Sequence, residues 1–158
     1  MDWTAQAQTV GEVALAMLLG GVIGVERELA DKPAGFRTHM LVAGAAALLV
    51  GLGDALIHRF DASGMGDNLR SDPIRIVEAI ITGISFLGAG TIFRRTDQKE
   101  HVEGLTTAAS ILMSSAIGIS VALRQFVMAV GVTLLALLTL RGFKFIQNWI
   151  DGLRQKKS

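Results

Sequence analysis

Five long apolar stretches dominate the sequence and limit what the chain can fold into. They cover about residues 10–25, 38–57, 74–93, 105–123 and 126–140, the last extending to about 146. A helix needs about 17–25 residues to cross a hydrocarbon core of about 30 Å. The middle three stretches meet this length, whereas the first and last are short unless flanking polar residues reach the membrane surface. The pattern predicts an all-α polytopic membrane protein, a bundle of about five transmembrane helices.

The composition supports this fold class and excludes several functions. Apolar residues make up 51% of the 158 residues and charged residues only 18%, below the quarter usual in soluble domains. A net charge of +1 leaves no basic face for nucleic acid. The chain has no Cys and three His, which excludes thiolate chemistry and disfavours zinc sites. A soluble helical domain would have to hide five apolar segments. We therefore expect a membrane protein without enzymatic activity.

The distribution of basic residues predicts the orientation. If the five helices alternate in direction, eleven of the 15 Lys and Arg residues lie on one side, in the segments 26–37 and 94–104 and after residue 140. The positive-inside rule then places the N-terminus outside and the C-terminus inside. No Lys or Arg precedes the first stretch, which argues against a signal peptide. We expect a transmembrane domain over 1–142 and an amphipathic basic cytoplasmic tail over 143–158.

Small residues recur at four-residue spacing within the apolar stretches. In a membrane such residues let helix backbones approach closely. Helix 105–123 carries the longest such ridge, which consists mainly of Ser and Thr hydroxyls followed by glycine. The alternative is that these hydroxyls line an ion or water path. The residues expected to pack helices together are Gly20, Gly24, Gly88, Gly90, Ser110, Ser114 and Gly118.

Three acidic residues lie at membrane depth: Glu12, Asp54 and Glu78. The expected orientation puts all three near the outer ends of their helices. Carboxylates inside a membrane protein often mark an ion site, and oxygen ligands suit Mg²⁺. These residues therefore form a candidate metal site, with Mg²⁺ as the one candidate cofactor.

Each acid also has a structural explanation. The first lies three residues after Thr9, the spacing of a capping box at a helix N-terminus. Asp54 can pair with His58 one turn later. The third lies one turn into a helix that we expect to begin with Asp72 as N-cap and Pro73 in the first turn. These explanations need no metal.

The two cytoplasmic hairpins are short and carry charges of both signs. They provide a candidate surface for a partner protein. A second hypothesis is that Arg37 of one hairpin binds the Glu103 carboxylate of the other with two parallel hydrogen bonds, which would clamp the two hairpins together. The alternative is a belt of charge that only satisfies the positive-inside rule. The candidate surface residues are Glu26, Arg27, Arg37, Thr38, Arg94, Glu103, Thr106 and Thr107.

Three ordered motifs give the chain a family resemblance. Gly-Val-Glu-Arg-Glu at 24–28 with Lys-Pro-Ala-Gly-Phe-Arg-Thr-His-Met-Leu-Val at 32–42 resembles the first signature of the MgtC/SapB family of bacterial inner-membrane proteins. Asp-Pro-Ile-Arg-Ile at 72–76 with Gly-Ile-Ser-Phe-Leu-Gly-Ala-Gly at 83–90 is similar to the second. Val-Glu-Gly-Leu-Thr-Thr-Ala-Ala-Ser at 102–110 is similar to the third.

The chain departs from this family at several positions. Ser85 replaces the usual Gly, Leu112 replaces a common Trp, and Glu78 is charged where members often are not. The segment 121–125 lacks the Gly-rich turn of relatives. Many members continue into an ACT-like cytoplasmic domain, so the resemblance is to a short member that lacks it.

The resemblance implies a role in adaptation to low magnesium and, in pathogens, in survival inside macrophages. It implies regulation by contact with a membrane partner such as the F-type ATP synthase. The alternative is a small oligomeric transporter or channel for Mg²⁺ or H⁺. In either case we expect a multi-pass protein of the inner membrane that contacts the lipid bilayer and forms a homo-oligomer, a dimer.

Overall fold

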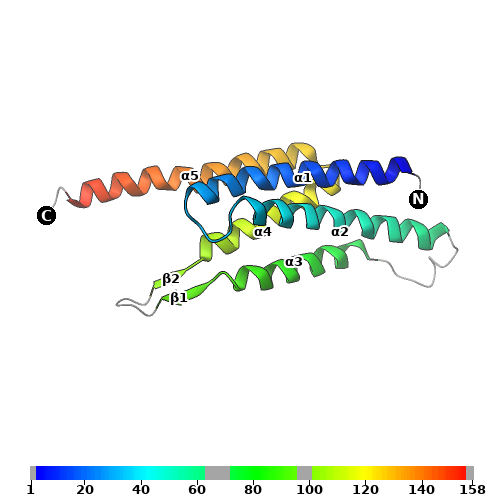
Figure 1. The fold of residues 1–158 in the computed structure, drawn as a ribbon, viewed down its shortest axis with the longest axis horizontal. Coiled ribbons are helices and arrows are strands. Elements are labelled where there is room, and N and C mark those ends of the chain that lie inside the picture. The colour runs from blue at the N-terminus through cyan, green and yellow to red at the C-terminus, as the bar shows by residue number, and fades with distance from the viewer. Residues whose placement is uncertain (1–2, 63–71, 96–100, 156–158) are drawn as a thin grey trace.

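The computed structural model describes the backbone of residues 3–62, 72–95 and 101–155, and their side chains apart from 61–62, 93–95, 101 and 143–155. Helices and strands follow one another in the order α1 (Trp3–Leu29), α2 (Phe36–Ala62), α3 (Pro73–Ala89), β1 (Phe93–Arg95), β2 (His101–Glu103), α4 (Leu105–Ala122) and α5 (Phe126–Gln155) (Figure 1).

The five helices run up and down the long axis of the molecule, so that their turns fall at two ends (Figure 1). The end with the N-terminus also holds the α4–α5 turn, and we call it the N-terminal end. The opposite end holds the α1–α2 turn and the β1–β2 hairpin, and we call it the hairpin end. Helices α1, α2, α4 and α5 share one apolar core, while α3 lies along α4 and α2 at the edge. The core residues are Ala16, Ile23, Ala43, Ala47, Ile117, Val121 and Ala129.

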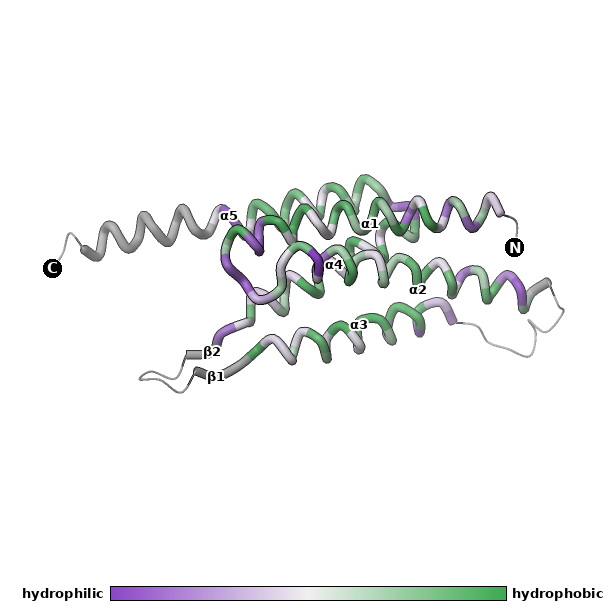
Figure 2. Tube along the Cα trace, in the orientation of Figure 1, coloured by the Kyte–Doolittle hydropathy of each residue, from purple (hydrophilic) through white to green (hydrophobic). Residues whose placement is uncertain are grey.

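The all-α membrane-type bundle expected from the sequence is confirmed. Among the described residues, three helical segments have the length and hydropathy to cross a membrane, namely Trp3–Leu29, Phe36–Phe60 and Leu105–Ala122. The apolar segment Phe126–Gly142 of α5 is slightly shorter. Apolar residues occupy the middle of the bundle and polar residues gather toward its two ends (Figure 2).

Two of the helices differ in length from their apolar stretches, the first because it includes the flanking polar residues that the sequence left open. The first helix is longer than its apolar stretch, since it begins at Trp3 and includes the polar residues before residue 10. The third is shorter, because α3 has 17 residues and ends at Ala89 rather than continuing to residue 93. After three intervening residues the chain enters β1, which pairs antiparallel with β2. This hairpin is absent from the sequence-based prediction. The helix therefore ends before the apolar stretch 74–93 does.

Local capping signals predict one helix start correctly and another wrongly. Asp72 caps α3 by accepting a hydrogen bond from the backbone N–H of Ile74 at 3.0 Å, with Pro73 in the first turn, as expected. The capping box at Thr9 is wrong, because Thr9 lies inside α1 and its hydroxyl donates to the carbonyl oxygen of Ala5. The helix starts earlier than the capping pattern suggests, and the acid at position 12 therefore lies in the helix interior.

The chain leaves α1 and α4 through the same type of turn. After α4, the N–H of Arg124 donates to the Val121 carbonyl and the N–H of Gln125 to the Ser120 carbonyl. This is the Schellman pattern, which needs a left-handed residue and usually has Gly there. Asp31 after α1 and Arg124 after α4 occupy that position with φ of 54° and 58°. Helix α5 continues without a break to Gln155, so no change of backbone marks residue 142.

Candidate functional site

Polar side chains are buried inside the bundle toward its hairpin end, where α1, α2 and α4 meet. Burying polar groups costs free energy unless they find hydrogen-bond partners. A concentration of such groups in a membrane protein of this size therefore marks a candidate site. We call it the buried polar cluster, and it consists of Glu26, Arg27, His39, Thr107, Ser110, Ser114 and Ser115.

Glu26 and Arg27 form a buried ion pair at the end of α1. Arg27 Nε donates to Glu26 Oε2 at 2.6 Å, and the two side chains are only 3–4% exposed. Consecutive helical residues ordinarily point in different directions, so this pairing reflects the enclosed surroundings. Removing either partner would leave an uncompensated buried charge, which is strongly destabilising.

His39 connects α2 to α4. Its Nδ1 lies 2.9 Å from the Gly35 carbonyl oxygen and its Nε2 lies 3.1 Å from Ser110 Oγ. A carbonyl oxygen only accepts, so Nδ1 carries a proton. In the neutral ring Nε2 is then an acceptor, and the hydroxyl of Ser110 donates to it.

The Ser110 hydroxyl has a second acceptor within reach. The Thr107 carbonyl oxygen lies 2.9 Å from Ser110 Oγ. A hydroxyl has one proton, so it donates either to the ring or to this carbonyl. If the ring carries both protons, Nε2 donates to Ser110 and the hydroxyl turns to Thr107. One turn further along α4, the hydroxyls of Ser114 and Ser115 are fully buried and have no hydrogen-bond partner among the described residues.

Backbone contacts hold the helices around this cluster close together. A Cβ on Gly20 would lie 2.5 Å from the His39 carbonyl oxygen, and one on Gly24 would lie 2.6 Å from Cα of Phe36. A Cβ on Gly118 would collide with the carbonyl oxygen of Ala43. These three glycines therefore lie directly at the contacts of α1 and α4 with α2, the arrangement that small residues allow in membranes.

The two glycines expected to pack α3 have weaker roles. A Cβ on Gly88 would make an ordinary contact with Ala108 of α4 at 3.4 Å. Gly90 is the C-cap of α3, and its neighbours are carbonyl oxygens of its own helix. The close approach at this end belongs instead to Gly104, which has a φ of 93° and whose Cβ would collide with the Thr91 carbonyl oxygen.

The expected partner surface divides into buried and exposed members. Glu26, Arg27 and Thr107 are buried in the cluster, whereas Arg37 and Thr106 are exposed. The remaining members differ: the side chains of Thr38 and Glu103 are partly exposed, and Arg94 lies in β1 with its side chain outside the described set. Only part of the expected surface is therefore accessible in one chain.

The expected clamp between Arg37 and Glu103 is wrong. Within the described side chains no ion pair joins these two residues. The α1–α2 turn is closed by Glu28 instead, whose carboxylate accepts from the Phe36 N–H at 2.8 Å at the start of α2. A carboxylate there is favoured by the helix dipole, and Arg37 is left exposed on the outside of the turn.

A pocket of about 590 Å³ lies at the N-terminal end between α1, α2 and the α4–α5 turn. It brings together two of the three expected acids, Glu12 and Asp54. Arg124 Nε donates to Glu12 Oε1 at 3.2 Å, and His58 Nδ1 lies 3.5 Å from Asp54 Oδ1, as the sequence suggested. The pocket is lined by Ala5, Gln8, Thr9, Glu12, Val50, Gly51, Asp54, Ala55, His58, Arg59, Ala122, Leu123 and Arg124.

The three expected acids do not come together in this pocket. Glu78 is not among the lining residues, and in the described part of the chain no three His, Asp or Glu side chains come close enough to hold a metal ion. The Glu12 carboxylate is instead paired with a guanidinium. Arg124 was not expected to take part.

The family model for the MgtC family matches residues 13–149, which include the buried polar cluster and the part of the pocket that α2 and the α4–α5 turn line. The chain belongs to the MgtC family. No solved structure matches the chain.

Three relatives give the scale of the similarity. An uncharacterized protein of Haemophilus influenzae is 35% identical over 146 residues, which are 92% of this chain and 60% of the relative. Protein MgtC of Brucella abortus is 42% identical over 120 residues, 75% of this chain and 44% of the relative. The Escherichia coli protein named "Putative magnesium transporter YhiD" is 34% identical over 142 residues, 87% of this chain and 61% of the relative.

The chain spans 44–61% of the length of these three relatives. The matched part is the helical bundle. Together with the apolar helices, the family places this chain among multi-pass proteins of the bacterial inner membrane, in a family whose names refer to magnesium.

Proposed function

We propose that this MgtC-family chain is a non-enzymatic regulatory protein of adaptation to low magnesium, and that it acts by contact with a membrane partner, with the F-type ATP synthase as the first candidate. Membership of the family supports the link to magnesium. The geometry of the bundle supports contact rather than transport.

The observation that carries this proposal is the closed packing along α4. The hydroxyls of Ser110, Ser114 and Ser115 are the polar groups that an ion path through the bundle would use, and all are 5% exposed or less. At Gly118 the α4 backbone approaches the Ala43 carbonyl so closely that a methyl group does not fit. A hydrated ion, which needs several waters around it in the case of Mg²⁺, has no room in such a contact.

The outside of the bundle offers the partner surface. At the hairpin end Arg37 and Thr106 are exposed beside the α1–α2 turn. An accessible guanidinium at this end suits a membrane partner that carries a carboxylate at its surface.

Inverted membrane vesicles from cells grown at low magnesium provide the test. We expect the chain to change the rate of ATP-driven proton pumping by the F-type ATP synthase, and Arg37→Glu to abolish this change at an unaltered protein level. Arg59→Glu is the matched control, because Arg59 is equally exposed but lies at the N-terminal end. Pumping that does not respond to the chain would contradict the proposed partner.

The second candidate function is transport of Mg²⁺ or H⁺. Two observations favour it: the printed name of the Escherichia coli relative, and the pocket at the N-terminal end, where two carboxylates lie at the mouth of the bundle. Proteoliposomes loaded with a magnesium-sensitive or pH-sensitive dye separate the two functions. The regulatory function predicts no ion entry beyond that of protein-free liposomes.

A further inference from the structure

Helix α3 is only slightly enclosed by the bundle, although it lies at the depth of two membrane spans. It packs along α4 and α2, both of which have the length and hydropathy of a span. Only Ile80 and Gly88 of its 17 residues are buried. Most of the rest of its surface faces away from the bundle, where a membrane protein contacts lipid or another protein.

The outward face of α3 is not apolar in the way that a lipid-facing surface is. At about 100° per residue, the side opposite Ile80 and Ile84 carries small and polar residues with a single large apolar side chain, Phe86, which is 85% exposed. Large aliphatic side chains such as Ile81 lie toward the flanks. The outward residues are Arg75, Glu78, Ala79, Thr82, Phe86 and Ala89.

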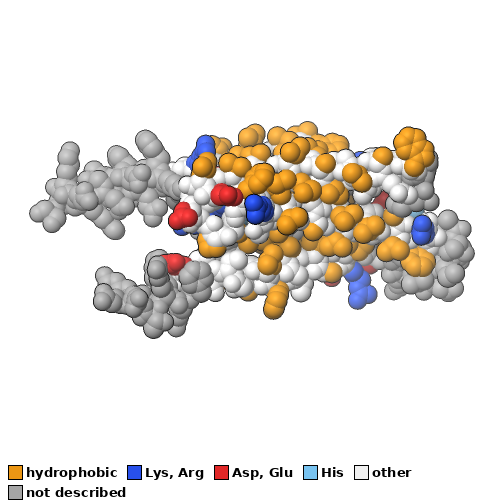
Figure 3. Space-filling model, in the orientation of Figure 1, with side chains coloured by type: hydrophobic (Ala, Val, Ile, Leu, Met, Phe, Trp, Pro, Cys, Tyr) orange, Lys and Arg blue, Asp and Glu red, His pale blue; other side chains and the backbone are white. Residues whose placement is uncertain are grey.

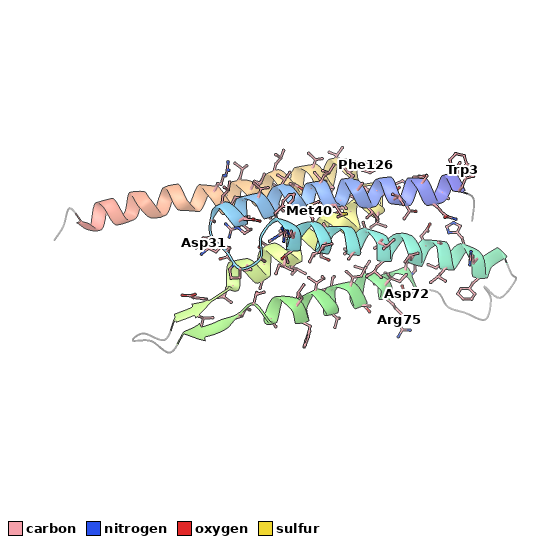
Figure 4. All side chains as sticks on the ribbon, viewed as in Figure 1. Trp3, Asp31, Met40, Asp72, Arg75 and Phe126 are labelled. Atoms are coloured by element: carbon pink, nitrogen blue, oxygen red, sulfur yellow. The ribbon has the colours of Figure 1, made fainter. Side chains whose placement is uncertain are left out.

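The figures show the same contrast. Hydrophobic side chains are dense over α1, α2 and α5 in this view, and sparser where α3 lies (Figure 3). Arg75 points away from the bundle (Figure 4). By comparison, α5 exposes Leu135 at 63% and Leu138 at 67%, as lipid contact requires. Small and polar residues in a membrane helix are instead typical of helix–helix contacts.

Two opposite charges on this face have no partner within the described part of the chain. Arg75 and Glu78 are both exposed, and no ion pair joins them to each other or to another described residue. They lie three positions apart, about 4.5 Å along the helix axis. A Cβ on the nearby Gly83 would meet no atom within 4 Å, so the backbone itself is accessible there.

We propose that the outward face of α3 binds a second copy of this chain, α3 against α3, in a two-fold symmetric dimer. A two-fold axis along the membrane normal places the same face on both sides. Arg75 then lies opposite the partner subunit's Glu78, and the same pair forms a second time. The Arg75 side chain is long enough to span the difference in membrane depth between positions 75 and 78. This self-complementary charge pattern favours a second copy over lipid and over an unrelated helix. The proposal is independent of the proposed function.

Disulfide crosslinking tests the contact directly, because the chain has no Cys of its own. We expect Thr82→Cys and Ala79→Cys to form disulfide-linked dimers on mild oxidation in native membranes. Leu135→Cys on α5 is the matched control, since Leu135 is also exposed at membrane depth. The absence of dimers with both α3 variants, or equal dimer formation with the control, would overturn the proposal.

The charges provide a second test in the Thr82→Cys background. Glu78→Arg places like charges opposite each other, which opposes association, so crosslinking falls strongly. Adding Arg75→Glu restores the opposite charges in exchanged positions, and crosslinking returns. Both residues are exposed, so neither change should alter the amount of folded protein, which a thermal melt of each variant checks. Unchanged crosslinking in Glu78→Arg, or no recovery in the exchange, would overturn the assigned pairing.

Discussion

His39 Nε2 lies 3.1 Å from Ser110 Oγ, and this contact joins α2 to α4 inside the bundle. The ring is fully buried and its other nitrogen is held by the carbonyl oxygen at the α1–α2 turn. The turn at the hairpin end is thereby linked to the second turn of α4 through one side chain. The link lies where Gly20 lets α1 approach α2. The packing of α1, α2 and α4 therefore depends on Gly20, His39 and Ser110.

Ser110→Ala should destabilise the protein by about 1–3 kcal/mol, because it leaves a buried ring nitrogen without its partner. Ser120→Ala is the control. Its hydroxyl lies in a more open site and donates either to the Ala116 carbonyl or to the sulfur of Met128. We expect a change of less than about 0.5 kcal/mol. Thermal unfolding in detergent measures both. Equal melting temperatures for the two variants would show that the His39 contact contributes little.

Gly118→Ala tests the tightest helix contact. The added methyl group would collide with the Ala43 carbonyl oxygen, and overpacking of this kind costs about 1–3 kcal/mol or more. Gly131→Ala adds the same methyl group to α5 where nothing lies within 4 Å, so we expect no loss of stability and a small gain in helix propensity. A melt of the two variants side by side distinguishes them. Comparable stability would mean that α2 and α4 lie further apart than described.

Asp31→Gly should stabilise the chain by up to about 1 kcal/mol, since Gly adopts the left-handed conformation without a steric cost. Arg124→Gly relieves the same strain but also removes the ion pair with Glu12, whose side chain is only 13% exposed. We therefore expect a higher melting temperature for Asp31→Gly than for Arg124→Gly. The opposite order would show that the ion pair contributes nothing to stability.

Features encoded by neighbouring residues were predictable from the sequence. The apolar stretches predict the helices, and Asp72 with Pro73 predicts the start of α3, because a cap depends only on residues within one turn. The Asp54–His58 pair is likewise one helical turn apart. The capping box at Thr9 failed because its four-residue pattern is also compatible with a helix interior.

Contacts between distant segments were not predictable in the same way. The clamp from Arg37 to Glu103 was inferred from complementary charge, but a nearer group, Glu28, closes the turn. The link from His39 to Ser110 joins residues 71 positions apart. One signal was available, because a His inside an apolar stretch needs a polar partner. The Ser and Thr hydroxyls along helix 105–123 were candidates for that partner. The role of Arg124 had no such signal.

The orientation in the membrane remains a prediction from charge. Eleven of the 15 Lys and Arg residues belong to the hairpin end and the segment after residue 140, so this end should face the cytoplasm. Fusions of a reporter that is active only outside the inner membrane should be active at Ser63 and inactive at the C-terminus. Activity at both positions would contradict five alternating spans.

The central claim is that the bundle is closed along α4 and does not carry ions. Its most direct test is Mg²⁺ entry into proteoliposomes that contain the purified chain and a magnesium-sensitive dye, under an imposed magnesium gradient. The closed packing at Gly118 and the 5% or lower exposure of the α4 serines predict the same entry rate as in protein-free liposomes. Mg²⁺ entry that rises with the amount of protein and saturates with magnesium concentration would contradict the account.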